Sequence, residues 1–444
     1  MAKIEPFCAW RYAPPLEAEL DRLLTPPYDV ISPALQEALY ARHPKNFCRI
    51  DFAREEPGDR EGHDKYGRAA ATWESWRREG TFRRDERPAF YVYEQEFALA
   101  GKPRRRRRGF FCAVALESLR QGEIRGHERT LEGPKADRLR LTRATQCNLS
   151  PIFALYEDVE RLIDGRLHEA TTGAPLMATT IDDVTHRLWT LTEASALADV
   201  IQAIRQRRLF IADGHHRYET ALAYQEERRR EQGGVASPQP FDSTLMFLCN
   251  AHGEGVEILP THRLLPADGW PRLKAGGLES GLTDAFDVTE LDGVREEGEA
   301  GLLATALEQA GRSGPAFIAL TSDGSARLLR LRPSAEPDRL IPGRDLPPEV
   351  KRLDVTLLHE FILKRLAAER PQGESAPVDY VHEIAEAIGA VRSGRATGAF
   401  LLNPTPTAQV IEIANLGARM PPKSTYFYPK IITGLVVRDL RPSD

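Results

Sequence analysis

The alternation of apolar and polar residues in the first quarter of the chain predicts two helices followed by a β-hairpin. A helix is expected over residues 32–43, where Ser32 can cap the N-terminus and Pro33 suits the first turn. A second helix is expected over 63–80, because Tyr66, Trp73 and Trp76 recur at helical spacing. Segments 89–99 and 104–119 read as strands joined by a turn at 101–103.

Farther along the chain, strands and helices alternate without regular βαβ spacing. Strands are expected over 184–191 and 209–212, helices over 196–206 and 218–230, and a second hairpin over 315–331. This pattern favours an α+β fold of mixed sheets with flanking helices. The length of 444 residues indicates more than one domain. The predicted segments are 1–88 (α-rich, contributing to the site), 89–262 (central α+β), 263–345 (an insertion or subdomain) and 346–444 (packing back on the core).

Composition narrows the class of protein. The hydrophobic fraction of 41% and charged fraction of 28% are typical of a globular protein without membrane spans. The N-terminus has no secretory-signal pattern, so a cytoplasmic location is expected. Five scattered cysteines form no CxxC pair, which argues against a disulfide framework or a cysteine zinc site.

Positive charge is concentrated at one place, the run Arg104–Arg108, although the net charge is −5. A nucleic-acid interpretation would need a recognisable binding module, and none follows. Because Glu94, Glu96 and Glu117 are close in sequence, the run is interpreted as a solvated hairpin arm.

The stretch FIADGHHRYETALAY, residues 210–224, places polar residues between an apolar strand and a helix. Such a junction presents unpaired backbone N–H groups and the positive end of a helix dipole, which favour anions. Gly214 allows close backbone approach, Arg217 could clamp a phosphate, and His215 and His216 could donate to phosphate oxygens. Asp213 could bind Mg²⁺ or cap the helix, so a capped helix without a site stays open.

Three further segments carry similar chemistry. Residues 127–138 are expected to form a loop around a Gly-Pro turn, and residues 420–430 contain paired prolines that resist a helix. Their candidate phosphate-binding residues are His127, Lys135, Arg138, Lys423, Ser424, Thr425 and Lys430. Phosphoryl transfer also needs a carboxylate near the accepting hydroxyl, for which Asp29 in PPYDVIS is the first candidate and Glu128 the second.

PPYDVIS, HERTLEGPKADRLRLTRATQCNLSPIFALY, FIADGHHRYETALAY and MPPKSTYFYPK, in this order, resemble a bacterial and archaeal family. It is catalogued as domain of unknown function number one thousand and fifteen. DGHHR also resembles the nucleotide-binding motif of free serine kinases of the ParB/sulfiredoxin-like group. That resemblance implies a partly ParB/sulfiredoxin-like fold, with Asp213, Gly214, His215, His216 and Arg217 at nucleotide phosphates and metal at Asp213.

The resulting hypothesis is ATP- and Mg²⁺-dependent phosphoryl transfer to a small hydroxylated metabolite, with free L-serine as the first candidate acceptor. One alternative is a metal-dependent phosphoesterase, because Asp213-x-His215 is similar to the opening ligands of a two-metal site. Another is a non-enzymatic regulator that binds nucleotide or nucleic acid. Neither a membrane nor nucleic acid is expected as a partner of the kinase, and a homodimer is left open.

Overall fold

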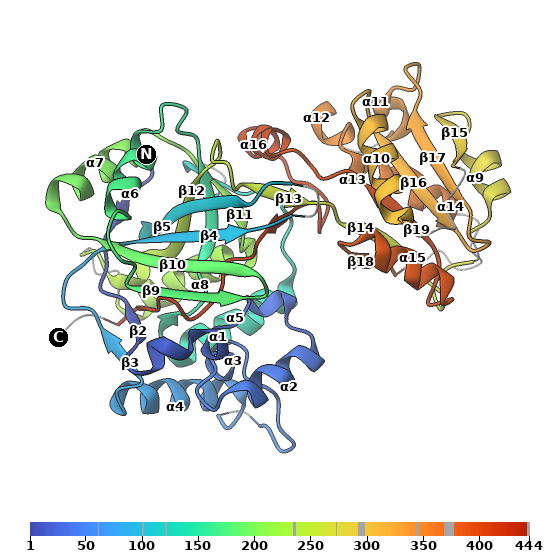
Figure 1. The fold of residues 1–444 in the computed structure, drawn as a ribbon. Coiled ribbons are helices and arrows are strands. Elements are labelled where there is room, and N and C mark those ends of the chain that lie inside the picture. The colour runs from blue at the N-terminus through green and yellow to red at the C-terminus, as the bar shows by residue number, and fades with distance from the viewer. Residues whose placement is uncertain are drawn as a thin grey trace. The chain divides into compact units, whose positions relative to one another are not determined.

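The structure is a computed structural model that describes residues 1–60, 62–99, 102–119, 122–233, 237–271, 273–291, 298–342, 346–367 and 377–441. The chain forms two compact units (Figure 1). Unit 1 comprises Met1–Gly126, Thr130–Glu257 and Pro429–Asp444, and unit 2 comprises His127–Arg129 and Ile258–Tyr428. Of the four predicted segments, 1–88 and nearly all of 89–262 fall in unit 1, and 263–345 falls in unit 2. The last segment is divided, because its final residues return to unit 1.

Unit 1 is built on a mixed sheet that has nine strands within the described residues, in the order β6-β11-β8-β12-β5-β4-β10-β9, with β1 paired to β5. The strands are β1 (Ile4–Glu5), β4 (Phe90–Phe97), β5 (Arg105–Ala115), β6 (Ile124–Arg125), β8 (Ile152–Tyr156), β9 (Met177–Ile181), β10 (Val184–Leu191), β11 (Leu209–Asp213) and β12 (Ser243–Asn250). The β6–β11 and β8–β12 pairs are parallel and the others antiparallel. Mixed pairing with irregular crossovers is the α+β pattern expected from the sequence.

Helices and short ribbons cover this sheet. They are α1 (Leu20–Leu23), α2 (Pro33–Arg42), α3 (Cys48–Asp51), α4 (Lys65–Arg78), α5 (Glu132–Thr145), α6 (Leu162–Ala170), α7 (Ala194–Arg205), α8 (His215–Glu231), the 3₁₀ turns η1 (Leu16–Glu19), η2 (Tyr28–Val30) and η3 (Pro240–Asp242), and the pairs β2 (Trp10–Tyr12)–β3 (Phe82–Arg84) and β7 (Cys147–Asn148)–β21 (Arg438–Asp439). The predicted helices form α2 and α4: Ser32 Oγ accepts the N–H of Leu35 at 3.2 Å, and Trp73 and Trp76 are buried.

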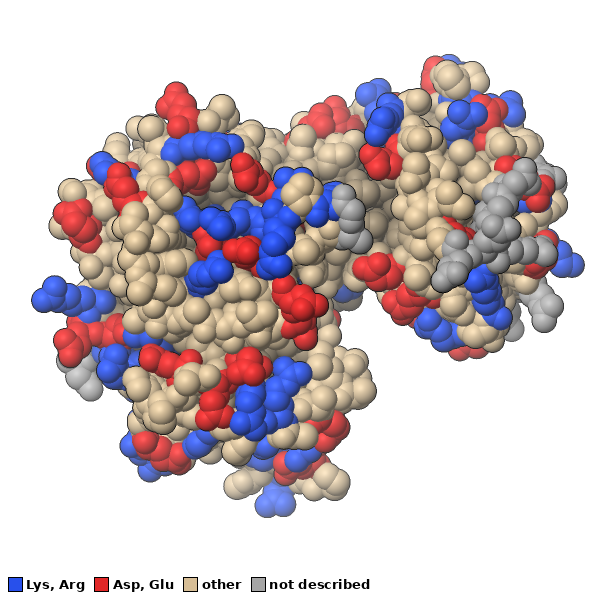
Figure 2. Space-filling model, viewed as in Figure 1, with Lys and Arg blue, Asp and Glu red and all other residues tan. Residues whose placement is uncertain are grey.

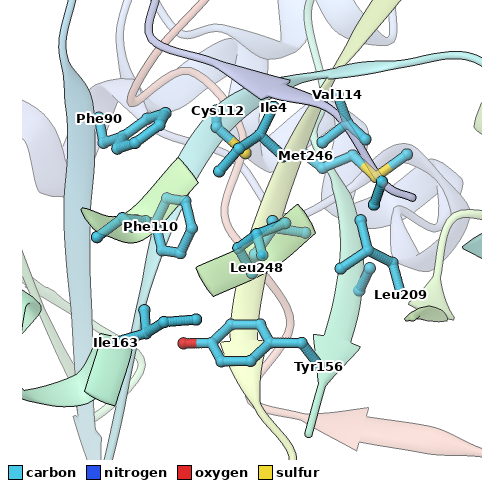
Figure 3. Close-up of a cluster of buried hydrophobic side chains, with 14 of the residues drawn as sticks. Ile4, Phe90, Phe110, Cys112, Val114, Tyr156, Ile163, Leu209, Met246 and Leu248 are labelled. Carbon is cyan, nitrogen blue, oxygen red and sulfur yellow. The ribbon is translucent and has the colours of Figure 1, made fainter. Parts of the chain in front are cut away.

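The two faces of the sheet bury different side chains. On one face, aliphatic and aromatic residues such as Phe110 and Leu248 pack with Ile163 of α6 and Val200 of α7 (Figure 3). The opposite face carries a row of aromatic rings, Tyr93, Phe111, Phe153 and Phe247. Because both faces of the central strands are covered, most of their side chains are buried whatever their polarity.

Unit 2 contains an antiparallel sheet of six strands among the described residues, in the order β15-β17-β16-β19-β14-β18. Its strands are β14 (His262–Pro266), β15 (Phe286–Leu291), β16 (Ala316–Thr321), β17 (Ala326–Leu331), β18 (Asp379–Val381) and β19 (Ala396–Leu402), with β13 (Glu257–Leu259) paired to β20 (Tyr426–Tyr428). The helices are α9 (Ala275–Leu282), α10 (Glu299–Gly311), α11 (Pro337–Leu340), α12 (Pro348–Lys351), α13 (Asp354–Leu357), the π-helix η4 (Leu358–Leu363), α14 (Lys364–Ala367), α15 (Ile384–Arg392) and α16 (Thr407–Asn415). The predicted hairpin over 315–331 is β16–β17.

Three local predictions are wrong. Helix α8 begins at His215, three residues earlier than expected, and strand β11 extends through Asp213. Gly133 and Pro134 are not a turn but belong to the first turn of α5, where proline is tolerated because its missing N–H would be unpaired there anyway.

The third wrong prediction concerns the run Arg104–Arg108, which is not solvated along its whole length. Arg106 and Arg108 contact Glu94, and Arg187 of β10 contacts Glu94 at 3.1 Å. Figure 2 shows blue and red side chains intermixed where β4 and β5 reach the surface. Arg107, in contrast, is only 1% exposed. The predicted turn of the hairpin lies partly outside the described residues.

In the described part of the chain, no helix is long and apolar enough to cross a membrane.

Candidate functional site

The β11–α8 junction in unit 1 has the backbone conformation that a tight strand-to-helix turn requires. Gly214 is the N-cap of α8 and adopts φ 93°, a left-handed conformation that residues with a Cβ rarely adopt. The N-cap is Gly214, which has no side chain, and Asp213 precedes it as the last residue of β11, so Asp213 is not the N-cap residue. The first turn of α8 therefore presents its N–H groups and the positive end of its dipole beside Asp213.

Asp213 lies between two cations. Its Oδ1 accepts a hydrogen bond from Lys430 Nζ at 2.9 Å, and its Oδ2 accepts one from Arg217 Nη2 at 2.7 Å. Burial alone would raise the pKa of Asp213, but the Lys430 and Arg217 charges hold this pKa well below its ordinary value. The carboxylate is therefore ionised at neutral pH and fixes the positions of two cationic groups.

Arg217 is held from both sides. Its Nη1 donates to Ser150 Oγ at 3.1 Å and to the Pro151 carbonyl, while Nη2 contacts Asp213. Only 9% of the Arg217 side chain is exposed. Its Nε is buried and has no hydrogen-bond partner within the described residues. The guanidinium is thus rigidly placed, and its Nε is enclosed beside Gly214.

Asp29 belongs to the same electrostatic neighbourhood. It lies in the 3₁₀ turn η2 and its side chain is exposed. Its charge helps to raise the pKa of Arg217, although burial of Arg217 acts in the opposite direction. Burial raises the pKa of the neighbouring Tyr28 to about 12. The charges of Arg217 and Asp213 also act on this pKa, Arg217 lowering it and Asp213 raising it. The structure therefore brings Asp29 to the Asp213 group, from a segment about 180 residues away in sequence.

The two histidines of the motif differ in their surroundings. His215 is 2% exposed, and a Cβ added to Gly126 would lie 3.1 Å from its ring. His216 Nε2 accepts the backbone N–H of Leu131 at 2.8 Å, so a neutral ring carries its proton on Nδ1. His216 therefore holds the segment that leads into α5.

Lys135 and Arg138 lie on α5, and both are paired with carboxylates. Lys135 Nζ contacts Glu132 at 2.7 Å and Glu219 at 3.2 Å. Arg138 contacts Asp137 at 2.6 Å, donates to the Asp51 carbonyl at 2.7 Å and lies over the Tyr28 ring. Through Tyr28, Arg138 adjoins the Asp213 group, whereas Lys135 is paired with Glu132 and Glu219.

The remaining candidates gather in unit 2. His127 Nε2 lies 3.2 Å from Thr425 Oγ1, and the Glu128 carboxylate accepts the Lys423 N–H at 3.1 Å. Ser424 is buried, and its Oγ donates to the Pro421 carbonyl at 2.6 Å. Lys423 is exposed and adopts φ 58°, a strained conformation for a residue other than glycine. Segment 127–128 and loop 420–425 thus form one group within unit 2.

Asp51 was missed by sequence reasoning. It is 1% exposed on α3, and it lines a cavity of about 50 Å³ together with Arg138, Ser150 and Arg217. Burial raises the pKa of Asp51, while Arg138 and Arg217 act to lower it. Nothing in the local sequence CRID marks this aspartate as buried, because its environment is supplied by α5 and α8.

The residues around Asp213 do not suit a resident Mg²⁺ ion. In the described part of the chain, no three His, Cys, Asp or Glu side chains are grouped so that they could hold a metal. Both Asp213 oxygens already accept hydrogen bonds from cations, whereas Mg²⁺ requires oxygen ligands in an octahedral arrangement. The arrangement fits an anion, and the predicted metal role of Asp213 finds no support in it.

A family model described as "Protein of unknown function (DUF1015)" matches residues 4–356, which is most of the chain. The chain belongs to this family. No curated protein matches the chain.

Several solved structures are similar. "Conserved hypothetical protein from Pyrococcus furiosus" is 12% identical, with 72% of this chain and 92% of that chain covered and a TM-score of 0.33. "Free serine kinase in complex with AMP" is 12% identical, with 72% and 88% covered and a TM-score of 0.33. "SbnI with C-terminal truncation from Staphylococcus aureus" is 10% identical, with 75% and 90% covered and a TM-score of 0.33. A likeness at this level is too low to carry an argument about this chain.

Proposed function

We propose that the start of α8 binds the phosphates of a nucleotide, and that the protein transfers a phosphoryl group from ATP to a small hydroxylated metabolite. Free L-serine is the first acceptor to test. The observation that carries the proposal is the arrangement at Asp213, where Lys430 and Arg217 are fixed beside a helix N-terminus. Two cations and a helix dipole in a partly buried place form an anion site.

The chemistry that such a site can perform is phosphoryl transfer. The acceptor oxygen attacks the γ-phosphorus of ATP, the bond to the β,γ-bridging oxygen breaks, and ADP leaves. Lys430, Arg217 and the N–H groups of α8 neutralise the negative charge on the phosphoryl oxygens during this step. In this proposal Gly214 leaves room for the Arg217 guanidinium at the start of α8, because a Cβ at Gly214 would lie 2.8 Å from Arg217 Nε.

Asp29 is proposed as the general base, because it is an exposed carboxylate within electrostatic range of Arg217. It takes the proton of the acceptor hydroxyl as the new oxygen–phosphorus bond forms. Its location on the rigid Pro-Pro-Tyr segment suits a base that must be positioned rather than flexible. Glu128 is the second candidate, although its carboxylate already accepts the Lys423 N–H.

The other candidate residues keep proposed roles of different kinds. His216 and Arg138 are proposed to organise the segments that border the phosphates, because each is engaged with backbone groups. His127, Lys423, Ser424 and Thr425 belong to unit 2, and their proposed phosphate-binding role is separate from the α8 site; the exposed Lys423 is the residue whose charge tests it.

The test is ADP formation from ATP and Mg²⁺ by the purified protein with a panel of hydroxylated amino acids and small alcohols. We expect ADP only when an acceptor is present, together with the phosphorylated acceptor in equal amount. Nucleotide unchanged with every acceptor would contradict the proposal. Phosphate release from phosphoesters without nucleotide would instead indicate the phosphoesterase alternative.

Asp29→Asn and the matched control Asp21→Asn separate a base from a general effect of charge. Both aspartates are exposed in the N-terminal part of unit 1. We expect only Asp29→Asn to lower the rate. Equal rates for the two variants would remove Asp29 from the mechanism and leave Glu128→Gln as the next variant to measure.

A further inference from the structure

The arginine run contains one residue whose environment differs from that of its neighbours. Arg107 is 1% exposed, whereas the side chain of Arg106 is 57% exposed. Successive side chains of a strand point to opposite faces, so Arg107 faces the covered, aromatic side of the sheet. Removing a guanidinium from water is costly, and a fully buried arginine therefore calls for a specific explanation.

The guanidinium of Arg107 binds one side chain and one backbone carbonyl. Its Nε donates to Gln95 Oε1 at 3.1 Å, and its Nη2 donates to Gln95 Oε1 and to the Pro429 carbonyl. It also lies over the Phe153 ring, 4.9 Å from the centroid. Burial lowers the pKa of Arg107 to about 10, so the group stays charged at neutral pH.

The segment that Arg107 holds is the one that carries Lys430. Gln95 Nε2 donates to the Lys430 carbonyl at 3.0 Å. The hydroxyl of Tyr93 accepts the N–H of Ile432 and lies 2.7 Å from His186 Nδ1. Residues 429–432 are thus fixed at their backbone by three side chains of the β4–β5 hairpin. This backbone is the base from which the Lys430 side chain extends to Asp213.

We infer that Arg107 and Gln95 are positioning residues that hold Lys430 at Asp213 by binding the carbonyl groups of the two peptide bonds on either side of the Lys430 Cα. The inference deepens the proposed function, and its consequence for catalysis rests on that function. The run Arg104–Arg108 then has two roles. Arg106 and Arg108 balance the charge of the buried Glu94, while Arg107 places a cation of the site without touching the ligand.

The first test measures how accessible the Lys430 ammonium group is, in the absence of nucleotide. Acetylation of lysines by an N-hydroxysuccinimide ester, followed by mass spectrometry, gives a rate for each ammonium group. Lys430 is 12% exposed and bound to Asp213, so its rate in the wild type should be low. Gln95→Glu keeps an acceptor for Arg107 and loses the donor to the Lys430 carbonyl. We expect this variant and Arg107→Lys to raise the Lys430 rate about tenfold, as for the loss of about 1.4 kcal/mol of restraint.

Two controls make this result specific. Arg106→Gln changes the neighbouring, exposed arginine and should leave the Lys430 rate unchanged. Lys65, which is paired with Asp137 in the same unit, reports general loosening and should react at the wild-type rate in every variant. Unchanged Lys430 acetylation in folded Gln95→Glu protein would overturn the inference, and so would an equal rise at Lys65.

The second test reads the catalytic consequence. If ATP turnover is observed, Gln95→Glu should raise the KM for ATP by up to about 100-fold, as expected for misplacing a binding group by about 1 Å, and leave the KM for the acceptor unchanged. Faster Lys430 acetylation in the variants of a protein that makes no ADP would support the positioning role and contradict the kinase. ADP formation by a protein whose Lys430 acetylation is unchanged in the variants would support the kinase and contradict the positioning role.

Discussion

The charge of Asp213 should contribute several kcal/mol to the stability of unit 1, which a helix cap would not. At 2.9 Å from Lys430 Nζ and 2.7 Å from Arg217 Nη2, each attraction is about 6 kcal/mol at an effective dielectric constant of about 20. The cost of removing these charged groups from water offsets most of this attraction. Breaking a buried ion pair typically costs about 3–5 kcal/mol, because the remaining cation is left uncompensated.

Asp213→Asn keeps the shape and one acceptor oxygen, so a loss of about 3 kcal/mol at the lower end of that range is expected. For a unit of this size, the melting temperature should fall by about 6–12 °C. Because the folded pKa of Asp213 lies below its unfolded value, its stabilising effect is present above about pH 4 and is lost as the pH falls through the folded pKa. The difference between wild type and variant should therefore shrink in acid.

The assay is thermal and urea unfolding of both proteins from neutral to acidic pH, combined with turnover per folded molecule. Asp158→Asn is the matched control, because Asp158 is buried and pairs with Arg207 at 2.6 Å, and neither residue is a site candidate. Both variants should lose stability, and only Asp213→Asn should lose turnover. Loss of a helix cap lowers the free energy of unfolding by about 1 kcal/mol, independent of pH. A loss of that size or less for Asp213→Asn would refute the ion-pair explanation.

Three further predictions test other parts of the chain. Asp29→Asn should lower kcat by about 10²–10⁴-fold with an unchanged melting temperature, as measured by ADP release beside Asp21→Asn. His216→Ala should cost about 0.5–1.5 kcal/mol in urea unfolding, because the exposed hydrogen bond from the Leu131 N–H to its Nε2 is lost. Burial raises the pKa of Asp354 in unit 2 to about 7, so unit 2 should lose stability as the pH rises from about 4 through 7. Asp354→Asn should abolish that dependence, and an unchanged pH profile in urea unfolding would contradict it.

The strand-to-helix junction could be predicted because its signals are local. An apolar run, a glycine and a helical pattern follow one another within fifteen residues, and the structure confirms β11, Gly214 and α8 in that order. The start of α8 was placed too late because His215, His216 and Arg217 are polar and only one side of the helix is buried. The buried side includes His215 and Arg217, which hydrophobic periodicity does not count as core.

The partners of Asp213 could be suspected from composition but not assigned. Lys430 is 217 residues away in sequence, and no local pattern tells which of several lysines reaches a given carboxylate. Asp51 gave no local signal, since the side chains that line its cavity, such as Arg138 and Arg217, come from α5 and α8. Long-range pairing of charged groups is decided by tertiary structure, whereas turns and caps are decided by neighbouring residues.

The different surroundings of Arg107 and its neighbours follow from the alternation of side chains along a strand. The run is followed directly by GFFCAVA, and the strand β5 spans both parts. A strand places alternate residues on opposite faces, so Arg106 and Arg108 must share one face and Arg107 the other. Strand β5 pairs with β4 along the arginine run and with β12 only from Gly109 onward, so the pairing of the strand does not by itself decide which arginine is buried. Arg107 lies on the covered aromatic face, and a buried arginine must find acceptors. Gln95, two strand positions from Tyr93 on the same face, supplies one of them, and the Pro429 carbonyl supplies the other.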